Sequence, residues 1–206
     1  GVVVASDSTG NTITSNQIYA NAGLGIDLGS DGVTPNDNDD SDTGANHLQN
    51  YPVLNGAYST DGGATGTASG VLTTNSNRDF RIELFGNASC DVSGSGAGQQ
   101  LVGSGTVSSG ASGVISFDIA ISGATDLPQI TTTATDLSTG DTSEFSTCTT
   151  ISEPPASTFT LFLPCSCTFQ GPGGGGYASY HSPILLSGPR VGPTTPRTIN
   201  PRLAWR

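Results

Sequence analysis

The stretch from residue 11 to residue 31 reads NTITSNQIYANAGLGIDLGSD, and its spacing decides the fold class. Asparagine recurs at every fifth position here, and isoleucine follows two residues behind, at Asn11, Ile13, Asn16, Ile18 and Asn21. A five-residue step fits neither the period of a helix, about 3.6 residues, nor the two-residue alternation of a long strand. It predicts short strands separated by sharp bends, with isoleucine pointing inward and asparagine at the corner, where left-handed backbone angles are tolerated.

With the GIDL of residues 25–28, this segment resembles the coils of right-handed parallel β-helix repeat proteins from bacterial surfaces. The resemblance implies that equivalent side chains stack into ladders along a solenoid axis. One coil cannot bury its apolar face without neighbours, so the run VVV at residues 2–4 is expected to complete a coil that follows others. We therefore predict that residues 1–30 are the terminal coils of a longer β-helix.

Residues 51–153 carry a different pattern, in which short alternating segments are separated by glycine and aspartate turns. In GVISFDIAI (residues 113–121), one face is Ile115, Phe117, Ile119 and Ile121, which we predict to be the core face. In FRIELFG (residues 80–86), Phe80, Ile82 and Leu84 face one way while Arg81, Glu83 and Phe85 face the other, and Arg81 is expected on the solvent side. The pattern predicts strands at 52–60, 64–72, 80–86, 100–107, 113–121, 129–136 and 143–150. Such short strands between turn residues indicate an immunoglobulin-like sandwich.

The string FRIELFGNASC, followed by QQLVGSGTV, SGVISFDIAI and ITTTATDLSTGDTSEFSTC, resembles the Ig-like module that often follows β-helix coils in bacterial surface proteins. Residues 23–54 resemble the connector that joins the two parts. The resemblance implies an all-β chain: β-helix coils at 1–30, an acidic connector at 31–50, an Ig-like sandwich at 51–153 and a tail at 154–206. It also implies an extracellular or cell-surface location, and it implies no established catalytic activity.

Charge divides the chain unevenly. All 17 acidic residues lie within residues 1–153, against only Arg78 and Arg81, whereas residues 154–206 hold four arginines and no acid. An acidic, lysine-free body argues against nucleic acid or anionic lipid as a partner, because phosphate contacts require Lys and Arg. No apolar run approaches the roughly 18 residues that a membrane-spanning segment needs.

The four cysteines fall into two pairs. An even pair in a small, exported-looking domain favours a Cys90–Cys148 disulfide, which would stabilise the domain by about 3–4 kcal/mol; two free thiols are the alternative. Cys165 and Cys167 are spaced C-x-C. A metal site there would need two further ligands, and only His181 is nearby, so we predict no metal at this pair.

The connector is the best candidate for chemistry. It concentrates carboxylates without any basic residue before Arg78, and closely spaced oxygen ligands suit Ca²⁺. The predicted calcium ligands are Asp31, Asp37, Asp39, Asp40 and Asp42. The spacing departs from the EF-hand because no Glu closes the loop at its twelfth position. The alternative is a solvated, flexible acidic loop that prevents aggregation at a sheet edge.

Two classes of function compete. The first is a non-catalytic surface or secreted module that binds polysaccharide or cell-surface glycans. The second is the C-terminal part of a β-helix polysaccharide lyase or glycosidase, whose active site would lie in preceding coils, since residues 1–30 offer only Asp7 and Asp27 and no base. His47 and His181 lie far apart in the sequence, so a hydrolytic triad is not expected. The Pro- and Gly-rich tail is predicted to be largely disordered, with residues 159–163 as its one compact apolar run, and its abrupt change of composition also fits translation in a shifted frame.

Overall fold

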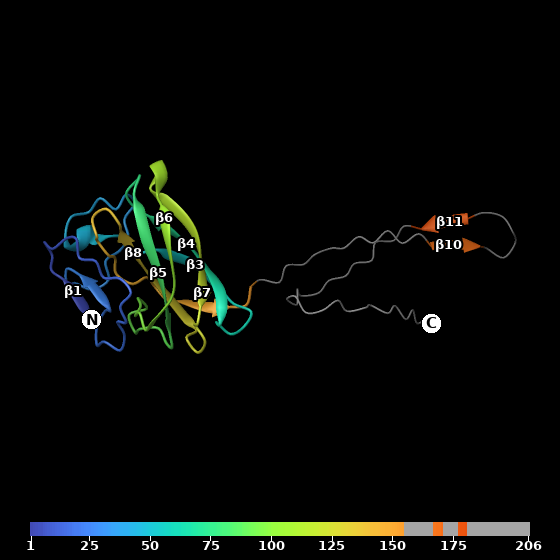
Figure 1. Cartoon of the computed structure of the whole chain (residues 1–206), viewed down its shortest axis with the longest axis horizontal. Helices are drawn as coiled ribbons and strands as arrows, with labels where there is room; N and C mark the ends of the chain where they lie inside the picture. Colours follow the sequence, from blue (N-terminus) through green and yellow to red (C-terminus); the bar gives the residue numbers. More distant parts are fainter. Residues whose placement is uncertain (155–166, 171–176, 181–206) are drawn as a thin grey trace. The chain divides into compact units, whose positions relative to one another are not determined.

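The computed structural model describes residues 1–154 and the strands at 167–170 and 177–180. The chain forms two units, Gly1–Pro154 and Pro155–Arg206 (Figure 1). In the second unit, β10 (Cys167–Gln170) pairs antiparallel with β11 (Tyr177–Tyr180). The rest of the tail predicted to be disordered, including residues 159–163 and Cys165, lies outside the described residues. The four-part division of the chain stays a prediction.

The first unit is all-β, and its main element is a nearly closed sheet of seven strands in the order β6-β5-β8-β9-β3-β4-β7. The strands are β3 (Val53–Tyr58), β4 (Thr65–Thr73), β5 (Asp79–Asn87), β6 (Gln100–Ser108), β7 (Val114–Ser122), β8 (Gln129–Asp136) and β9 (Thr149–Ser152). Short β9 joins the two halves, because it pairs parallel with β3 and antiparallel with β8. The end strands β6 and β7 contact each other across the remaining gap. In the described residues, no helix is long and apolar enough to cross a bilayer.

The core inside this sheet confirms the predicted alternation. Ile115, Phe117, Ile119 and Ile121 of β7 are buried in it, as are Phe80, Ile82 and Leu84 of β5. The opposite face of β5 differs from the simple alternating pattern, because Glu83 and Phe85 are also buried. Their face is covered by residues 1–50, so β5 is enclosed on both sides, and a two-residue period cannot reveal the second cover.

The predicted strand at 143–150 is wrong for residues 143–148. This segment is held by two isolated β-bridges, Thr135↔Thr142 and Ser95↔Thr147. Strand β9 begins only at Thr149. Two serine hydroxyls accept hydrogen bonds that main-chain carbonyls would accept in a regular strand pair. The Oγ of Ser143 accepts the N–H of Ala134 at 2.9 Å, and the Oγ of Ser146 accepts the N–H of Thr132 at 3.1 Å. Side-chain bonds of this kind compete with regular pairing.

In the N-terminal segment, β1 (Val2–Val4) pairs parallel with β2 (Ile26–Leu28), and Val2 faces Ile26, 24 residues further along the chain. Between them the backbone turns left-handed at Gly10, Ser15 and Ala20, with φ of 74°, 59° and 55°. The predicted five-residue period of bends is therefore present. However, the left-handed residue precedes each asparagine rather than being the asparagine itself.

A second core joins this segment to the sheet. It contains Val4, Ile26 and Leu28 from β1 and β2, Ala45 from the 3₁₀ turn η1 (Ala45–Leu48), Phe85 from β5, and Phe145 from the segment before β9. The rings of Phe85 and Phe145 meet edge to face with centroids 5.3 Å apart. Ile13 and Ile18 pack against this cluster, so both isoleucines point inward as predicted. Buried apolar surface thus connects residues 1–50 to the seven-stranded sheet.

Candidate functional site

Buried carboxylates line the boundary between residues 1–50 and the seven-stranded sheet. Glu144 is 2% exposed. Its Oε1 accepts the main-chain N–H of Leu28, and its Oε2 accepts that of Thr34, each at 2.9 Å. Because Leu28 belongs to β2, Glu144 satisfies a backbone donor on the strand edge that β1 does not use. Glu144 acts here as a cap on a sheet edge.

Glu83, on β5, likewise bonds to the N-terminal segment. Its carboxylate is fully buried and accepts both the N–H and the hydroxyl of Ser15, at 2.8 and 3.0 Å. Arg81 pairs with it, with Nη2 2.8 Å from Oε1. Arg81 was expected on the solvent side, and its side chain, 36% exposed, reaches this buried carboxylate. Ser15 is one of the left-handed bend residues, so Glu83 holds one bend of the N-terminal segment.

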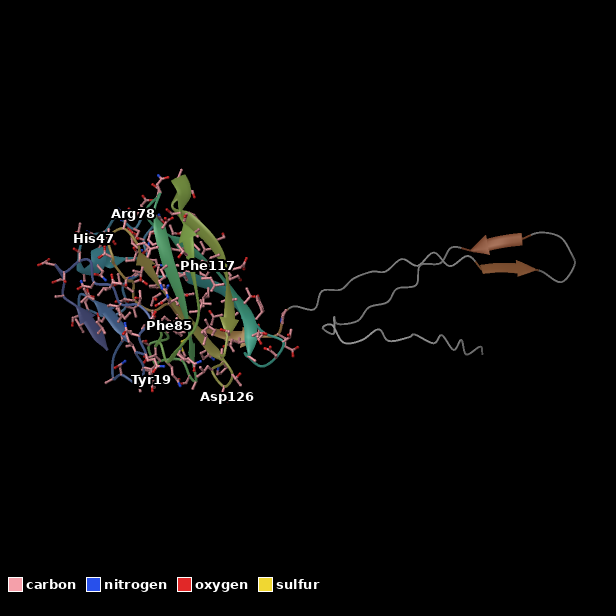
Figure 2. All side chains as sticks on the ribbon, viewed as in Figure 1. Tyr19, His47, Arg78, Phe85, Phe117 and Asp126 are labelled. Atoms are coloured by element: carbon pink, nitrogen blue, oxygen red, sulfur yellow. A yellow bond between two sulfur atoms is a disulfide. The ribbon has the colours of Figure 1, made fainter. Side chains whose placement is uncertain are left out.

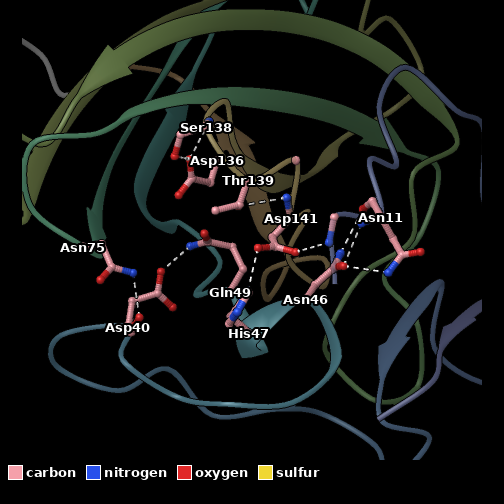
Figure 3. A network of polar contacts seen from close by, with 12 residues as sticks. Asn11, Asp40, Asn46, His47, Gln49, Asn75, Asp136, Ser138, Thr139 and Asp141 are labelled. Carbon is pink, nitrogen blue, oxygen red and sulfur yellow. Dashed lines mark hydrogen bonds and ion pairs between the residues drawn. The ribbon is translucent and has the colours of Figure 1, made fainter. Parts of the chain in front are cut away.

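Asp141 connects three parts of the chain. Its Oδ1 accepts the N–H of Gly10 at 2.6 Å, and its Oδ2 lies 2.8 Å from Nδ1 of His47 (Figure 3). Beside this pair, the amide of Asn46 donates to the carbonyls of Asn11 and Thr142. Asn46 and His47 both have left-handed backbones, with φ of 45° and 49°. These bonds hold a conformation that non-glycine residues adopt only at a cost.

Asp40 is the most enclosed acid of the connector. Its carboxylate accepts hydrogen bonds from the N–H of Asn50 at 2.8 Å, from Gln49 Nε2 at 2.6 Å and from the hydroxyl of Thr74 at 2.7 Å. Its own N–H donates to Oδ1 of Asp37 at 2.7 Å. Asp37 and Asp40 therefore fold the connector onto β4 and onto itself.

A cleft of about 300 Å³ opens where these groups meet (Figure 3). Its charged lining is Asp40, Asp42, His47, Arg78, Asp136 and Asp141. Arg78 donates to Oδ2 of Asp136 at 2.6 Å. Figure 2 places His47 and Arg78 at one end of the first unit, away from Tyr19 and Asp126. The cleft is polar and predominantly acidic, without an aromatic side chain in its lining.

The acids of this boundary differ in proton affinity. Burial raises the pKa of Asp40 above its ordinary value, although hydrogen bonds from Thr74, Asn50 and Gln49 oppose the rise. Burial also raises the pKa of Glu144, against the bonds from Leu28 and Thr34.

For two acids at the cleft, hydrogen bonds outweigh burial. Burial pushes the pKa of Asp136 upward, but bonds from Ser138 and Arg78 bring it below the ordinary value. Asp141 behaves alike, since its bonds from Thr139, Gly10 and His47 outweigh burial and lower its pKa. Neighbouring carboxylates thus have opposite shifts, which result from their different hydrogen-bond donors.

The predicted calcium ligands do not converge. Asp37 and Asp40 bond within the connector, whereas Asp31, Asp39 and Asp42 are exposed and make no hydrogen bond to the described residues through their carboxylates. In the described part of the chain, no three acidic, His or Cys side chains are grouped as metal ligands would be. Calcium binding therefore stays a prediction.

The disulfide between Cys90 and Cys148 is confirmed, with Cα atoms 5.9 Å apart. It ties the loop after β5 to the segment before β9. The residues that sequence reasoning missed are Glu83, Glu144, Asp141, His47 and Arg78. Glu83 lies on the face of its strand that the alternation assigns to solvent, so nothing local marks it. Glu144 and Asp141 lie in a polar stretch, where no local pattern distinguishes a buried acid from a solvated one.

No protein-family model matches this chain. A comparison with curated proteins also finds no match.

Proposed function

We propose that this chain is a non-catalytic, extracellular structural and adhesive module of a bacterial surface or secreted protein. In this proposal, residues 1–30 are the terminal coils of a right-handed parallel β-helix, and residues 51–153 are an Ig-like sandwich that spaces or anchors them. The module presents its surface to polysaccharide or cell-surface glycans. Nucleic acid is not a partner, given the acidic body.

The observation that carries the proposal is the hydrogen-bonded boundary between the N-terminal segment, residues 1–50, and the seven-stranded sheet. The main-chain N–H of Ser15 donates to the buried carboxylate of Glu83, and those of Leu28 and Thr34 donate to the buried carboxylate of Glu144. A solenoid exposes unpaired backbone groups at its last coil, and these promote aggregation unless they are covered. Covering them with a second folded part converts an open end into a rigid joint, as a load-transmitting surface module requires.

Two further features support the location and the architecture. The Cys90–Cys148 disulfide suits an oxidising compartment. The parallel pairing of Val2 with Ile26 has the long connection that one solenoid coil requires, and Val4, Ile26 and Leu28 point into a shared core.

The alternative is that the chain is the C-terminal, non-catalytic part of a β-helix polysaccharide lyase or glycosidase, with the active site in preceding coils. An active site in the cleft itself is a separate hypothesis, suggested by the opposite pKa shifts of its acids. Against it, every carboxylate oxygen of Asp40 and Asp141 already accepts a bond from the chain itself. We therefore assign the cleft to stabilisation of the joint.

Calcium binding by the connector belongs to the proposal, with Asp31, Asp37, Asp39, Asp40 and Asp42 as the ligands, of which Asp31, Asp39 and Asp42 are exposed. A ligand that binds only the folded state raises the melting temperature by mass action. Millimolar calcium should thus stabilise the protein relative to EDTA, with a dissociation constant on the order of 10⁻⁴–10⁻³ M. The double variant Asp39→Asn/Asp42→Asn should abolish the shift. Identical melting curves in both buffers would remove calcium from the proposal.

The function is tested by two assays on the intact chain. A glycan array should show binding, and incubation with pectin, chitin or xylan should release no product. Turnover of any of these polysaccharides would favour the enzymatic alternative. A blank array would leave a structural joint without an adhesive role.

A further inference from the structure

A small pocket lies beside the disulfide, between the coil and the loop that joins β5 to β6. Its volume is about 270 Å³, and its lining includes Tyr19, Asn87, Ser89, Asp91, Val92 and Gln99. It is separate from the acidic cleft, since Figure 2 places Tyr19 at the opposite end of the unit from Arg78. The pocket is slightly smaller than the roughly 300–1,000 Å³ of drug-sized sites. Its size suits one ring.

The pocket has one apolar side. Tyr19 is 50% exposed and is the one aromatic among the large exposed apolar side chains of the described residues. Val92 is fully exposed on the loop and also lines the pocket. An aromatic side chain usually buries most of its ring. An exposed tyrosine at the rim of a cavity therefore offers a surface on which the C–H face of a ring can pack.

The other side carries unused hydrogen-bonding groups. Gln99 uses its Oε1 to accept the N–H of Ala88, which leaves Nε2 as a donor. Asp91 uses Oδ1 for Ser93, which leaves Oδ2 as an acceptor. Neither free atom, nor the hydroxyl of Ser89, bonds to a residue that the structure describes. The lining therefore includes a donor, an acceptor and a hydroxyl that no described residue uses.

Both walls are fixed in place. The N–H and carbonyl of Ile18 form a reciprocal pair with Gly98, each bond 2.7 Å long, so the residue before Tyr19 is tied to the sandwich. On the other wall, the disulfide anchors Cys90, and the N–H of Gln99 donates to Asn87 at 2.9 Å. A pocket whose walls are held by such bonds loses little conformational entropy on binding.

From these features we infer that the pocket binds one neutral pyranose ring at the end of a glycan. A pyranose has an apolar C–H face and a rim of hydroxyls. Its C–H face suits Tyr19 and Val92, and its hydroxyls suit Gln99, Ser89 and Asp91. Asp91 is the one charged residue of the lining, so uronic and sialic acids are disfavoured by like-charge repulsion. The inference rests on the proposed adhesive function and assigns its ligand class and its site.

Saturation-transfer NMR on the full chain tests the inference. The probes are the methyl glycosides of glucose, galactose, mannose and N-acetylglucosamine, with methyl glucuronide as the acidic match for methyl glucoside. At least one neutral glycoside should receive saturation with a dissociation constant on the order of 1 mM, since one ring makes few contacts. Methyl glucuronide should bind several-fold more weakly than methyl glucoside.

Two variants and a control localise the binding. Tyr19→Ala should weaken the best neutral glycoside about three- to tenfold, whereas Tyr19→Phe should retain binding because the ring remains. Leu137→Ala removes an equally exposed side chain, 52% exposed and next to Asp136 of the cleft, and should change nothing. Near-ultraviolet circular dichroism checks that each variant is folded.

Three outcomes would overturn the inference: no saturation of any neutral glycoside, equal binding of methyl glucuronide, or unchanged binding by Tyr19→Ala. The glycan array separates these from failure of the proposed function. If Tyr19→Ala still binds the array as the native chain does, the adhesive function stands and the pocket is not its site. If the native chain gives a blank array, the adhesive function itself fails.

Discussion

The carboxylate of Glu144 accepts the main-chain N–H of Leu28 at 2.9 Å, across 116 residues of sequence. This bond links β2 to the polar segment before β9. Glu144 is buried and no basic side chain of the described residues pairs with it, so its carboxylate depends on the N–H groups of Leu28 and Thr34 and on the hydroxyl of Thr34, 3.4 Å from Oε1. The joint is therefore sensitive to single changes at this residue.

Replacing Glu144 by alanine should destabilise the first unit. The change leaves the buried N–H of Leu28 and the half-buried N–H of Thr34 without acceptors, which costs about 1–3 kcal/mol for a fully buried group and less for Thr34. Urea unfolding should therefore show a loss of about 2–5 kcal/mol. Glu153→Ala is the matched control, since Glu153 is exposed, and should lie within about 0.5 kcal/mol of the native protein.

The pH dependence should reveal the raised pKa of Glu144. Burial makes the folded state hold this proton more tightly than the unfolded chain. The resulting stabilisation is fully present below the ordinary value of 4.5 and is lost as pH rises through the folded pKa. The unfolding free energy of the native protein, minus that of Glu144→Gln, should therefore fall as pH rises. A constant difference would contradict the shift.

Asp136 should show the opposite slope, because hydrogen bonds hold its pKa below the ordinary 3.8. The contribution of Asp136 to the unfolding free energy is present above pH 3.8 and is lost as pH falls through the folded pKa. The native protein should therefore lose its advantage over Asp136→Asn in acid. Melting curves of both proteins, recorded from neutral pH down to about pH 2, measure this. A gap that widens in acid would show that the sign is wrong.

The close packing of the second core predicts a glycine-specific effect. A Cβ at Gly98 would lie 2.7 Å from the ring of Phe145 and 3.0 Å from that of Phe85. Gly98→Ala should cost about 1–3 kcal/mol through overpacking. Gly23→Ala provides the control, since a Cβ there meets nothing within 4 Å. Equal stability of the two variants, measured by urea unfolding, would contradict the packing of this core.

Much of the seven-stranded sheet could be predicted because its strands alternate. Ile115 to Ile121 in β7 mark the core face without ambiguity. The five-residue bends of the N-terminal segment could also be predicted, although the left-handed positions are Gly10, Ser15 and Ala20. The known preference of asparagine for left-handed angles led to the bends being predicted at Asn11, Asn16 and Asn21, one residue after their actual positions.

The joint could not be predicted, because its key residues look ordinary in sequence. Glu83 and Phe85 occupy the outward face of a strand, and their burial depends on a segment about 70 residues away. Asp40 and Asp37 resemble metal ligands, but each is used by neighbouring backbone donors. Such tertiary pairings leave no local period or spacing to read.

Removing the disulfide should weaken the unit without separating its parts. The bridge closes a 58-residue separation, and its loss should cost about 3–4 kcal/mol on the chain-entropy account. The double variant Cys90→Ala/Cys148→Ala, unfolded in urea without reductant, measures the loss. Non-reducing peptide mapping of the native protein should recover the two cysteine peptides linked. Recovery of both as alkylated free thiols would contradict the bridge.

The most direct test of the joint is hydrogen exchange at two amides, Leu28 in β2 and Ile82 in β5. If the N-terminal segment and the seven-stranded sheet form one cooperative unit, both amides should exchange only through global unfolding and give the same opening free energy. Exchange of Leu28 at a free energy several kcal/mol below that of Ile82 would mean that the N-terminal segment opens independently. That result would contradict the rigid joint on which the proposed function depends.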